Sequence, residues 1–309
     1  MASNSILSPK NILVTGFSGF VGSNLASFLG VSTKWIITPF DRNSKSINGY
    51  EIFFNADYVL HLAGKAHDLK KVRNPEEYYK VNTDLTKKVF DSFLVSNAKV
   101  FIILSSVKAV ADQVIGELTE DQIADPITHY GKSKLLAEEY ILSKEIPKGK
   151  RVYILRSCMI HGPGNKGNLN ILYQLVSKGI PWPLGSFYNK RSFCSIDNLL
   201  FIFKELMERQ DIPSGVYNVS DDEPLSTNEL ISILAESQNK RPKIWKVSKR
   251  LVKFFAKFGN LFRLSLNEER LQKLTDSYVV SNKKIKSVIG KPFPVSSKEG
   301  LLKTFKSFN

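Results

Sequence analysis

The fold of this chain is decided by residues 12–25, Ile12-Leu13-Val14-Thr15-Gly16-Phe17-Ser18-Gly19-Phe20-Val21-Gly22-Ser23-Asn24-Leu25. An apolar run precedes three glycines, Gly16, Gly19 and Gly22, and an apolar-periodic stretch follows them. This order predicts a strand, a tight turn and a helix. The glycines would let the backbone turn sharply and approach a pyrophosphate at the positive end of the helix. Because the motif follows the first predicted strand, it indicates a dinucleotide site.

Apolar runs alternate with helical patterns along the first half of the chain. Strands are expected at about 11–15, 35–40, 57–62, 100–105 and 151–156, and helices at 20–30, 75–96 and 127–145. The alternation predicts an α/β fold with a doubly wound parallel sheet, which is the Rossmann arrangement.

The composition changes after residue 165, where a segment rich in Gly, Pro and Asn leads into short helical patterns. We therefore expect residues 1–165 to form a dinucleotide-binding domain, to which about 190–220 return. Tyr217-Asn218-Val219 is expected to be the returning strand. Residues 166–189 and 221–309 are expected to form a smaller α/β lobe that binds substrate.

Two serines, Ser105 and Ser106, follow an apolar run typical of a strand that is buried on both faces. Ligands of open parallel sheets lie at the carboxyl ends of the strands, so a serine there could hydrogen-bond a substrate oxygen. The alternative is that both hydroxyls satisfy backbone groups of the following loop.

Tyr130 and Lys134 are four residues apart in His129-Tyr130-Gly131-Lys132-Ser133-Lys134 and would share one face of a helix. A cation beside a phenol favours phenolate and lowers the pKa of the phenol toward the range of proton transfer. The pair alone also fits a solvated helix surface. The glycine turn and the strand-end serines favour the catalytic interpretation.

Together these motifs resemble the extended short-chain dehydrogenase/reductase family, in its nucleotide-sugar epimerase, dehydratase and reductase branch. The resemblance runs along most of the chain and implies NAD or NADP as cofactor and a nucleotide-diphosphate sugar as substrate. It is carried by residues 16–22, 57–64, 105–106, 130–134, 155–164 and 191–199.

By resemblance, Tyr130 exchanges the proton of the reacting sugar hydroxyl and Ser106 binds the same oxygen, while Lys134 holds the nicotinamide ribose and lowers the phenol pKa. The residues expected at the cofactor are Gly16, Phe17, Ser18, Gly19, Phe20, Val21, Gly22, Asp57, Leu62, Ala63, Gly64, Tyr130 and Lys134. Those expected at the substrate, besides Ser106, are Asn168, Arg191 on the diphosphate, Trp182 and Arg270. Packing is the alternative role for Trp182.

The end of the second predicted strand bears on the choice between NAD and NADP. Asp41 lies nineteen residues after Gly22, where a carboxylate accepts from the ribose hydroxyls of NAD. Arg42 could instead pair with the extra phosphate of NADP. NAD is favoured because a carboxylate repels a phosphate, and a surface turn remains the alternative for the pair.

Departures from the family pattern bear on the reaction type. Dehydratases of this branch carry an Asp-Glu pair after the catalytic Ser or Thr, where this chain has Val107 and Lys108, so 4,6-dehydration is not expected. The segments 105–108 and 64–67 look most like enzymes that reduce 4-keto-6-deoxy sugars on UDP, in surface polysaccharide synthesis. We therefore favour a 4-keto reductase, with Lys108 stabilising the alkoxide. A UDP-hexose or UDP-N-acetylhexosamine 4-epimerase is the alternative.

The remaining composition is that of an ordinary globular protein of 309 residues. Two cysteines and four histidines, without metal-ligand spacing, indicate neither a disulfide framework nor a metal site. The N-terminus lacks an apolar signal core and no apolar run reaches membrane-spanning length, so a cytoplasmic location is expected. By resemblance to the family, whose members commonly pair two helices from each subunit, the predicted helices 75–96 and 127–145 are candidates for the interface of a homodimer.

Positive charge is concentrated at the C-terminal end. Residues 240–309 hold 18 Lys or Arg against 4 Asp or Glu. Residues 245–262 predict a basic amphipathic helix, whose apolar face either packs on the substrate lobe or contacts anionic lipid at the inner membrane surface. A Rossmann-type protein that binds nucleic acid or senses a cofactor without turnover is a remote alternative, and no nucleic acid is expected.

Overall fold

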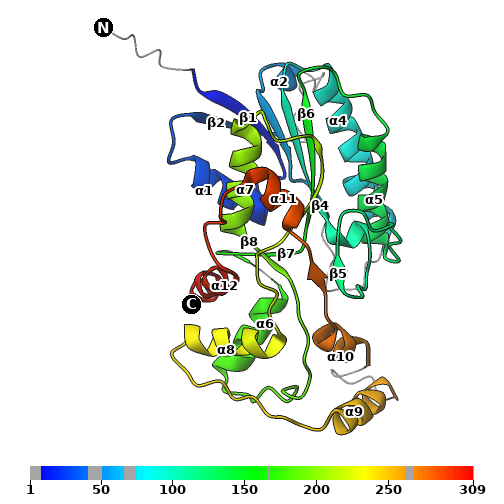
Figure 1. Cartoon of the computed structure of the whole chain (residues 1–309), viewed down its shortest axis with the longest axis vertical. Coiled ribbons are helices and arrows are strands. Elements are labelled where there is room, and N and C mark those ends of the chain that lie inside the picture. Colours follow the sequence, from blue (N-terminus) through cyan, green and yellow to red (C-terminus); the bar gives the residue numbers. More distant parts are fainter. Residues whose placement is uncertain (1–7, 41–50, 66–73, 166, 262–267, 309) are drawn as a thin grey trace.

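A parallel sheet forms the centre of the molecule in the computed structural model, which describes residues 8–40, 51–65, 74–165, 167–261 and 268–308 (Figure 1). Its six strands lie in the order β2-β1-β3-β4-β6-β9. They are β1 Lys10–Thr15, β2 Trp35–Phe40, β3 Tyr58–His61, β4 Val100–Ser106, β6 Arg151–Ser157 and β9 Gly215–Val219. This confirms the predicted fold class, including the returning strand.

Helices cover both faces of the sheet, as expected of a doubly wound fold (Figure 1). On one face lie α1 Phe20–Leu29 and α7 Ile196–Glu208, and on the other lie α4 Leu85–Val95 and α5 His129–Leu142. Because strand side chains alternate, Ile12 and Val14 of β1 pack in the cluster with α1 and α7. Leu13 packs in the other cluster, with α4 and α5.

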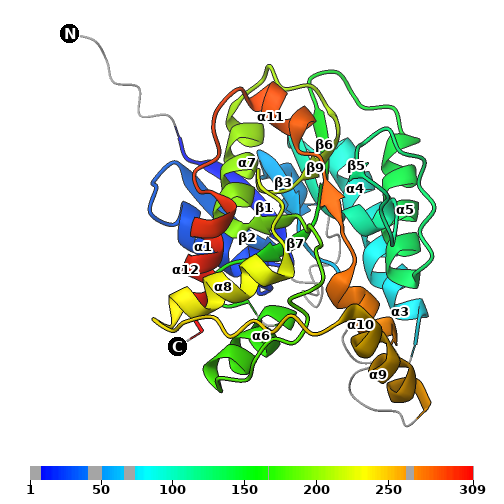
Figure 2. The same ribbon diagram turned by 60° about the horizontal axis from the view of Figure 1, so that its bottom comes forward.

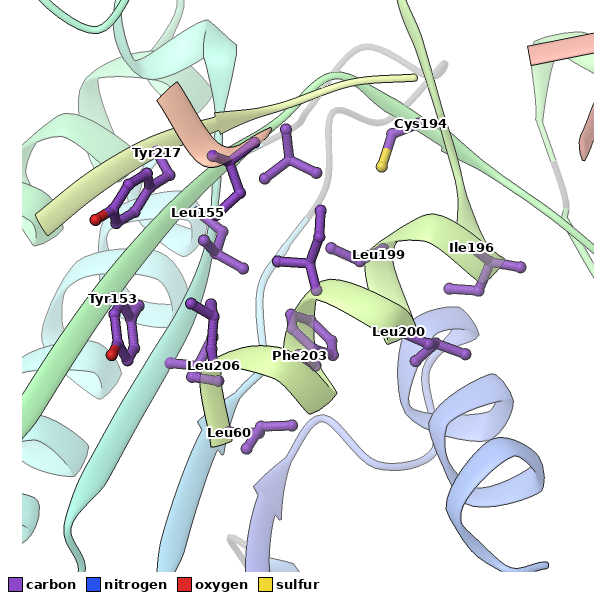
Figure 3. Close-up of a cluster of buried hydrophobic side chains, with 14 of the residues drawn as sticks. Leu60, Tyr153, Leu155, Cys194, Ile196, Leu199, Leu200, Phe203, Leu206 and Tyr217 are labelled. Carbon is purple, nitrogen blue, oxygen red and sulfur yellow. The ribbon is translucent and has the colours of Figure 1, made fainter. Parts of the chain in front are cut away.

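The helix α7 returns residues 196–208 to the sheet and supplies much of one core. Figure 3 shows its apolar side chains facing those of the sheet, with Leu199, Phe203 and Leu206 on α7 and Tyr153, Leu155 and Tyr217 on the strands. All of these side chains are fully or almost fully buried. Residues 196–208 therefore pack against the central sheet, although they follow the change in composition after residue 165.

The predicted helix 75–96 is confirmed over residues 76–95, and a π turn interrupts its α-helical geometry. It divides into α3 Glu76–Tyr78, a π-helical turn η1 Tyr79–Asp84, and α4. The wide turn carries Asn82, whose buried side chain bonds to other segments. Single π turns are frequent at functional sites, and this one lies against α5.

A second cluster of buried apolar side chains lies below the carboxyl ends of the strands in Figure 1. It is built mainly from α6 Asn168–Ser177, α8 Thr227–Ser237 and α12 Ser297–Lys306. Val252 and Ala256 are added by α9 Lys249–Leu261, and Leu271 is added by α10 Glu268–Thr275. The domain limits predicted from the sequence stay a prediction.

Short elements complete the described chain. Two small parallel pairs join β7 Met159–His161 to β8 Phe193–Ser195 and β5 Glu117–Leu118 to β10 Val279–Val280. The other helices are α2 Glu51–Phe54, the 3-10 turn η2 Val107–Ala109 and α11 Lys283–Ile289. Among the described residues, no helix has the length and apolar character needed to cross a bilayer.

Candidate active site

Three chain segments meet at one edge of the sheet because β1, β3 and β4 are adjacent and parallel. The glycine turn follows β1, residues 62–64 follow β3, and Ser106 ends β4. This is the carboxyl edge, where ligands of open α/β sheets lie. The residues predicted at these three strand ends therefore lie together at this edge.

The glycine turn is tightly packed against the neighbouring strand end. Gly16 has a φ of +70°, and a Cβ there would lie 2.6 Å from the backbone nitrogen of Ala63. A Cβ on Gly22 would lie 2.3 Å from the carbonyl oxygen of Phe17. Only glycine avoids both clashes, so the turn brings bare backbone to the amino end of α1.

These features fit a dinucleotide. No side chain caps the amino end of α1, where Gly19 precedes the first turn, so its backbone N–H groups remain available to an anion. Residues 16–22 could therefore hold the pyrophosphate, with 62–64 lying alongside. The fit agrees with the cofactor positions that the sequence predicts for these two segments.

The ends of β1 and β3 are tied together by a buried histidine. The hydroxyl of Thr15 lies 2.7 Å from Nδ1 of His61, and Nε2 of His61 lies 2.8 Å from the hydroxyl of Thr86. Burial, aided by the charge of Lys134, lowers the pKa of His61 to about 3. A neutral imidazole thus bridges two hydroxyls beneath the cofactor segments.

Ser106 and Tyr130 are in direct contact. Tyr130 is the second residue of α5, and its hydroxyl is hydrogen-bonded to that of Ser106. The Tyr130 ring also meets the Tyr78 ring edge-on, with 6.0 Å between centroids. Two of the groups predicted to handle a sugar hydroxyl therefore lie side by side.

The pKa of Tyr130 does not move in the direction that the sequence predicted for it. Burial raises this pKa, the hydrogen bond from Ser106 opposes the rise, and Tyr78 adds to it. The ammonium of Lys134 instead donates to the carbonyl of Leu104, with 3.0 Å between nitrogen and oxygen. In the protein alone, the phenol therefore stays protonated.

Lys134 is buried one helical turn after Tyr130. Burial lowers its pKa to about 8, although the charge of Glu138 opposes the shift. A Cβ on Gly64 would lie 3.1 Å from its ammonium nitrogen, so Lys134 reaches the cofactor segment after β3. Lys134 therefore lies near both the segment proposed to bind the cofactor and Tyr130, the residue proposed to transfer the proton.

A buried ion pair holds α5 against the sheet, and sequence reasoning missed its role. Glu138 Oε2 accepts from Nε and Nη2 of Arg156 at 2.9 and 2.7 Å, and its other oxygen accepts from the Ser105 hydroxyl. Ser105 thus faces α5 and does not line the site with Ser106. The strand-interior Arg156 was the available signal, because a buried guanidinium requires a partner.

Asn82 is a second residue that the sequence analysis missed. Its side chain accepts from the backbone N–H of Lys65 at 2.8 Å and donates to the carbonyl of the same residue at 3.1 Å. It also donates to the Ser133 hydroxyl at 3.0 Å. Asn82 therefore links the segment after Gly64 to the helix that carries Tyr130.

The start of α5 is fixed by Asp112. Its carboxylate accepts from the backbone N–H groups of Ile127 and Thr128 at 2.8 and 3.0 Å. The Thr128 hydroxyl then accepts from the N–H of Gly131, which caps the helix. The loop after Ser106 therefore sets where the helix of Tyr130 begins.

Lys108 and Asp57 lie differently from the sequence expectation. The Lys108 ammonium donates to the carbonyl of Asp112 at 2.8 Å and lies 4.2 Å from the centre of the Tyr278 ring. Asp57 precedes β3, at the amino edge of the sheet, where it accepts from Lys10 and from the backbone of Asn11. The structure does not bring Asp57 to the glycine turn.

Two more of the predicted substrate residues, Arg191 and Trp182, lie in the part of the chain that the structure describes. Arg191 pairs through its backbone with Leu225, and burial lowers the pKa of its guanidinium against the opposing effect of Asp276. The indole of Trp182 is 4% exposed, lies within the second cluster and donates to Asn228 at 3.1 Å. This placement supports the packing role for Trp182.

Some predicted residues lie outside the part that the structure describes. They are Asp41 and Arg42, and the side chains of Asn168 and Arg270. Within the described residues, no group of three or more His, Cys, Asp or Glu side chains is placed to hold a metal ion. The two cysteines, Cys158 and Cys194, are free and buried.

The sequence matches a family model described as the NAD dependent epimerase/dehydratase family over residues 12–220. The UDP-glucose 4-epimerase of Vibrio cholerae is 32% identical, over 97% of this chain and 96% of that protein. A UDP-2-acetamido-2,6-beta-L-arabino-hexul-4-ose reductase of Pseudomonas aeruginosa is 28% identical, over 74% of this chain and 58% of that protein.

One further relative acts on a lipid-linked sugar by its name. The N-acetyl-alpha-D-glucosaminyl-diphospho-ditrans,octacis-undecaprenol 4-epimerase of Escherichia coli O157:H7 is 28% identical, over 75% of this chain and 73% of that protein. Among solved structures, a UDP-glucuronic acid 4-epimerase from Bacillus cereus in complex with NAD has a TM-score of 0.73. It is 18% identical and covers 96% of this chain and 98% of its own, so it supports the fold.

A substitution that keeps the shape of the side chain but removes its charge tests the buried ion pair. Glu138→Gln removes the carboxylate and leaves the Arg156 guanidinium buried without a counter-charge, which costs about 3–5 kcal/mol of unfolding free energy. Glu139→Gln, at the exposed next position, is the matched control and should change it by less than about 0.5 kcal/mol. Urea unfolding measures the stability of both variants. Equal unfolding midpoints would contradict a stabilising role for the ion pair.

Proposed function

This chain belongs to the NAD-dependent epimerase/dehydratase family, and we propose that it is a 4-epimerase of a sugar carried on a nucleoside diphosphate. It is an NAD(P)-dependent enzyme of the nucleotide-sugar epimerase and reductase kind. The observation that carries the proposal is the contact between the Tyr130 and Ser106 hydroxyls at the carboxyl edge, beside the glycine turn.

Tyr130 and Ser106 would act on the proton and the oxygen of one sugar hydroxyl group. When bound, the nicotinamide supplies the acceptor and donor of hydride at C4. We assign to Tyr130 the removal and return of the proton on the C4 hydroxyl, and to Ser106 a hydrogen bond to the same oxygen. Lys134, one turn further along the helix, would supply the positive charge that favours the phenolate once it turns from the Leu104 carbonyl.

Two observations favour an epimerase over the reductase expected from the sequence. The relative that matches almost the whole chain is named a 4-epimerase. The reductase interpretation included a role for Lys108 at the reacting carbonyl, yet its ammonium contacts the Asp112 carbonyl and the Tyr278 ring. Both activities share the first half-reaction, so the assigned roles of Tyr130 and Ser106 are the same in each.

A 4-keto reductase is the second candidate, favoured by the relative with that name and by the segment Ser105-Ser106-Val107-Lys108. Val107 and Lys108 stand where a dehydratase needs its acid and base, so 4,6-dehydration is not proposed.

The carrier of the sugar is proposed to be UDP, with Arg191 on the diphosphate. A diphosphate on a polyprenyl chain is the second form, because one relative acts on such a substrate by its name. The proposed dimer would use η1 with α4 and α5, which the sequence predicted as interface helices.

Replacement of Tyr130 by Phe tests the assignment of the proton. We expect turnover to fall by about 10²–10⁴-fold, with cofactor binding retained, because the hydroxyl is lost and the ring remains. Tyr140→Phe is the matched control, since this tyrosine lies on the same helix and bonds to Asp91 instead. Tyr130→Phe turnover equal to that of Tyr140→Phe would contradict the proposal.

The bound nucleotide separates the two candidate reactions. An epimerase regenerates its cofactor in each cycle, so denaturation of the purified protein should release stoichiometric NAD. UDP-glucose or UDP-N-acetylglucosamine should then yield its C4 epimer without added cofactor, as followed by chromatography. Release of no nucleotide, together with oxidation of reduced cofactor by a UDP-4-keto sugar, would establish the reductase instead.

A further inference from the structure

Three large apolar side chains in the described part of the helix α9 are turned away from the protein. Leu251, Phe254 and Phe255 are 48%, 54% and 55% exposed, whereas Val252 and Ala256 are buried in the second cluster. The sequence left open whether the apolar face packs on the substrate lobe. The structure places two small side chains there and leaves the larger ones facing outward.

The spacing of these residues explains the division. Val252 and Ala256 are four apart and form a narrow stripe on the buried side of α9. Leu251, Phe254 and Phe255 are spaced by three and four residues, so they share a second stripe on the helix surface. The rings of Phe254 and Phe255 lie 5.9 Å apart. The helix therefore presents a continuous apolar patch to the outside.

Positive charge surrounds this patch without any carboxylate in the same stretch. Residues 240–257 contain eight Lys or Arg and no Asp or Glu. All eight are exposed, namely Lys240, Arg241, Lys243, Lys246, Lys249, Arg250, Lys253 and Lys257. Such a surface is complementary to an anionic one.

Two exposed aromatic side chains lie outside α9 but close to its first residues. Trp245, just before the helix, is 59% exposed. Tyr188 is 77% exposed, and the Lys249 ammonium lies 5.9 Å from its ring centre. Figures 1 and 2 both place α9 at the outer edge of the molecule, away from the central sheet.

We propose that residues 240–257 dock on an anionic lipid bilayer, with Leu251, Phe254 and Phe255 entering the interface and the lysines meeting headgroup phosphates. Helices that lie in the membrane interface combine Trp, Phe or Leu on one side with Lys and Arg on the other. Protein interfaces, by contrast, are depleted of Lys at their centres. The docking does not depend on the proposed chemistry.

Vesicle sedimentation with the full chain tests the proposal. Phosphatidylcholine vesicles that contain phosphatidylglycerol should pellet the protein at low salt, less of it at physiological salt, and pure phosphatidylcholine should pellet little. The double variant Phe254→Ser/Phe255→Ser should lower the partition coefficient about tenfold or more. The double variant Lys253→Gln/Lys257→Gln should do the same.

Matched controls come from exposed residues elsewhere. Ile115→Ser/Ile123→Ser removes two exposed apolar side chains, and Lys34→Gln/Lys148→Gln removes two exposed lysines that precede β2 and β6. Both controls should pellet like the wild type, and all variants should retain turnover of a water-soluble substrate. Failure of the catalytic proposal would leave this pelleting pattern unchanged.

Three results would overturn the docking. The first is absence of pelleting with anionic vesicles at low salt. The second is equal loss of pelleting in the control variants and in the α9 variants. The third is that the Phe254→Ser/Phe255→Ser variant still pellets with vesicles but loses a concentration-dependent dimer or binding to RNA. The patch would then serve another partner.

Discussion

The ion pair between Glu138 and Arg156 is the interaction on which the candidate site depends. It joins the middle of α5 to β6, while the Ser105 hydroxyl joins the same carboxylate to β4. Two strands thus fix the rotation of α5 about its axis. Ser106 is the next residue on β4, so the same contacts set its approach to Tyr130. A buried pair of this kind contributes position more than stability.

A second constraint aligns the cofactor segments with that helix. Gly16 and Ala63 approach so closely that no side chain fits at position 16. Gly64 has no side chain to crowd the Lys134 ammonium. Asn82 ties the backbone of Lys65 to Ser133 of α5. The glycine turn, the segment after β3 and the helix of Tyr130 are therefore parts of one packed unit. On this view the π turn is the geometry that lets Asn82 reach both neighbours.

The strands and the glycine turn could be predicted because their signals are local, as in the apolar runs before Gly16 and Ser105. Contacts between distant residues could not. Glu138 looks like any helix-surface glutamate until Arg156 is placed opposite it, and Lys108 meets Tyr278 from 170 residues away. Periodicity identified the apolar residues of α9 that share a face, but what covers that face depends on tertiary packing. Asp57 is different: it begins the predicted strand 57–62, and the start of a parallel strand lies at the amino edge of the sheet, so the sequence already argued against a place at the cofactor.

The central claim is that Tyr130, Ser106 and Lys134 are held against a nicotinamide beside the glycine turn. A crystal structure of the protein with NAD bound tests this most directly. We expect the pyrophosphate to bind at residues 16–22 and the Tyr130 hydroxyl to face the nicotinamide ring. We also expect Lys134 to turn from the Leu104 carbonyl to the nicotinamide ribose. A dinucleotide bound elsewhere, or a Tyr130 hydroxyl pointing away from the ring, would contradict it.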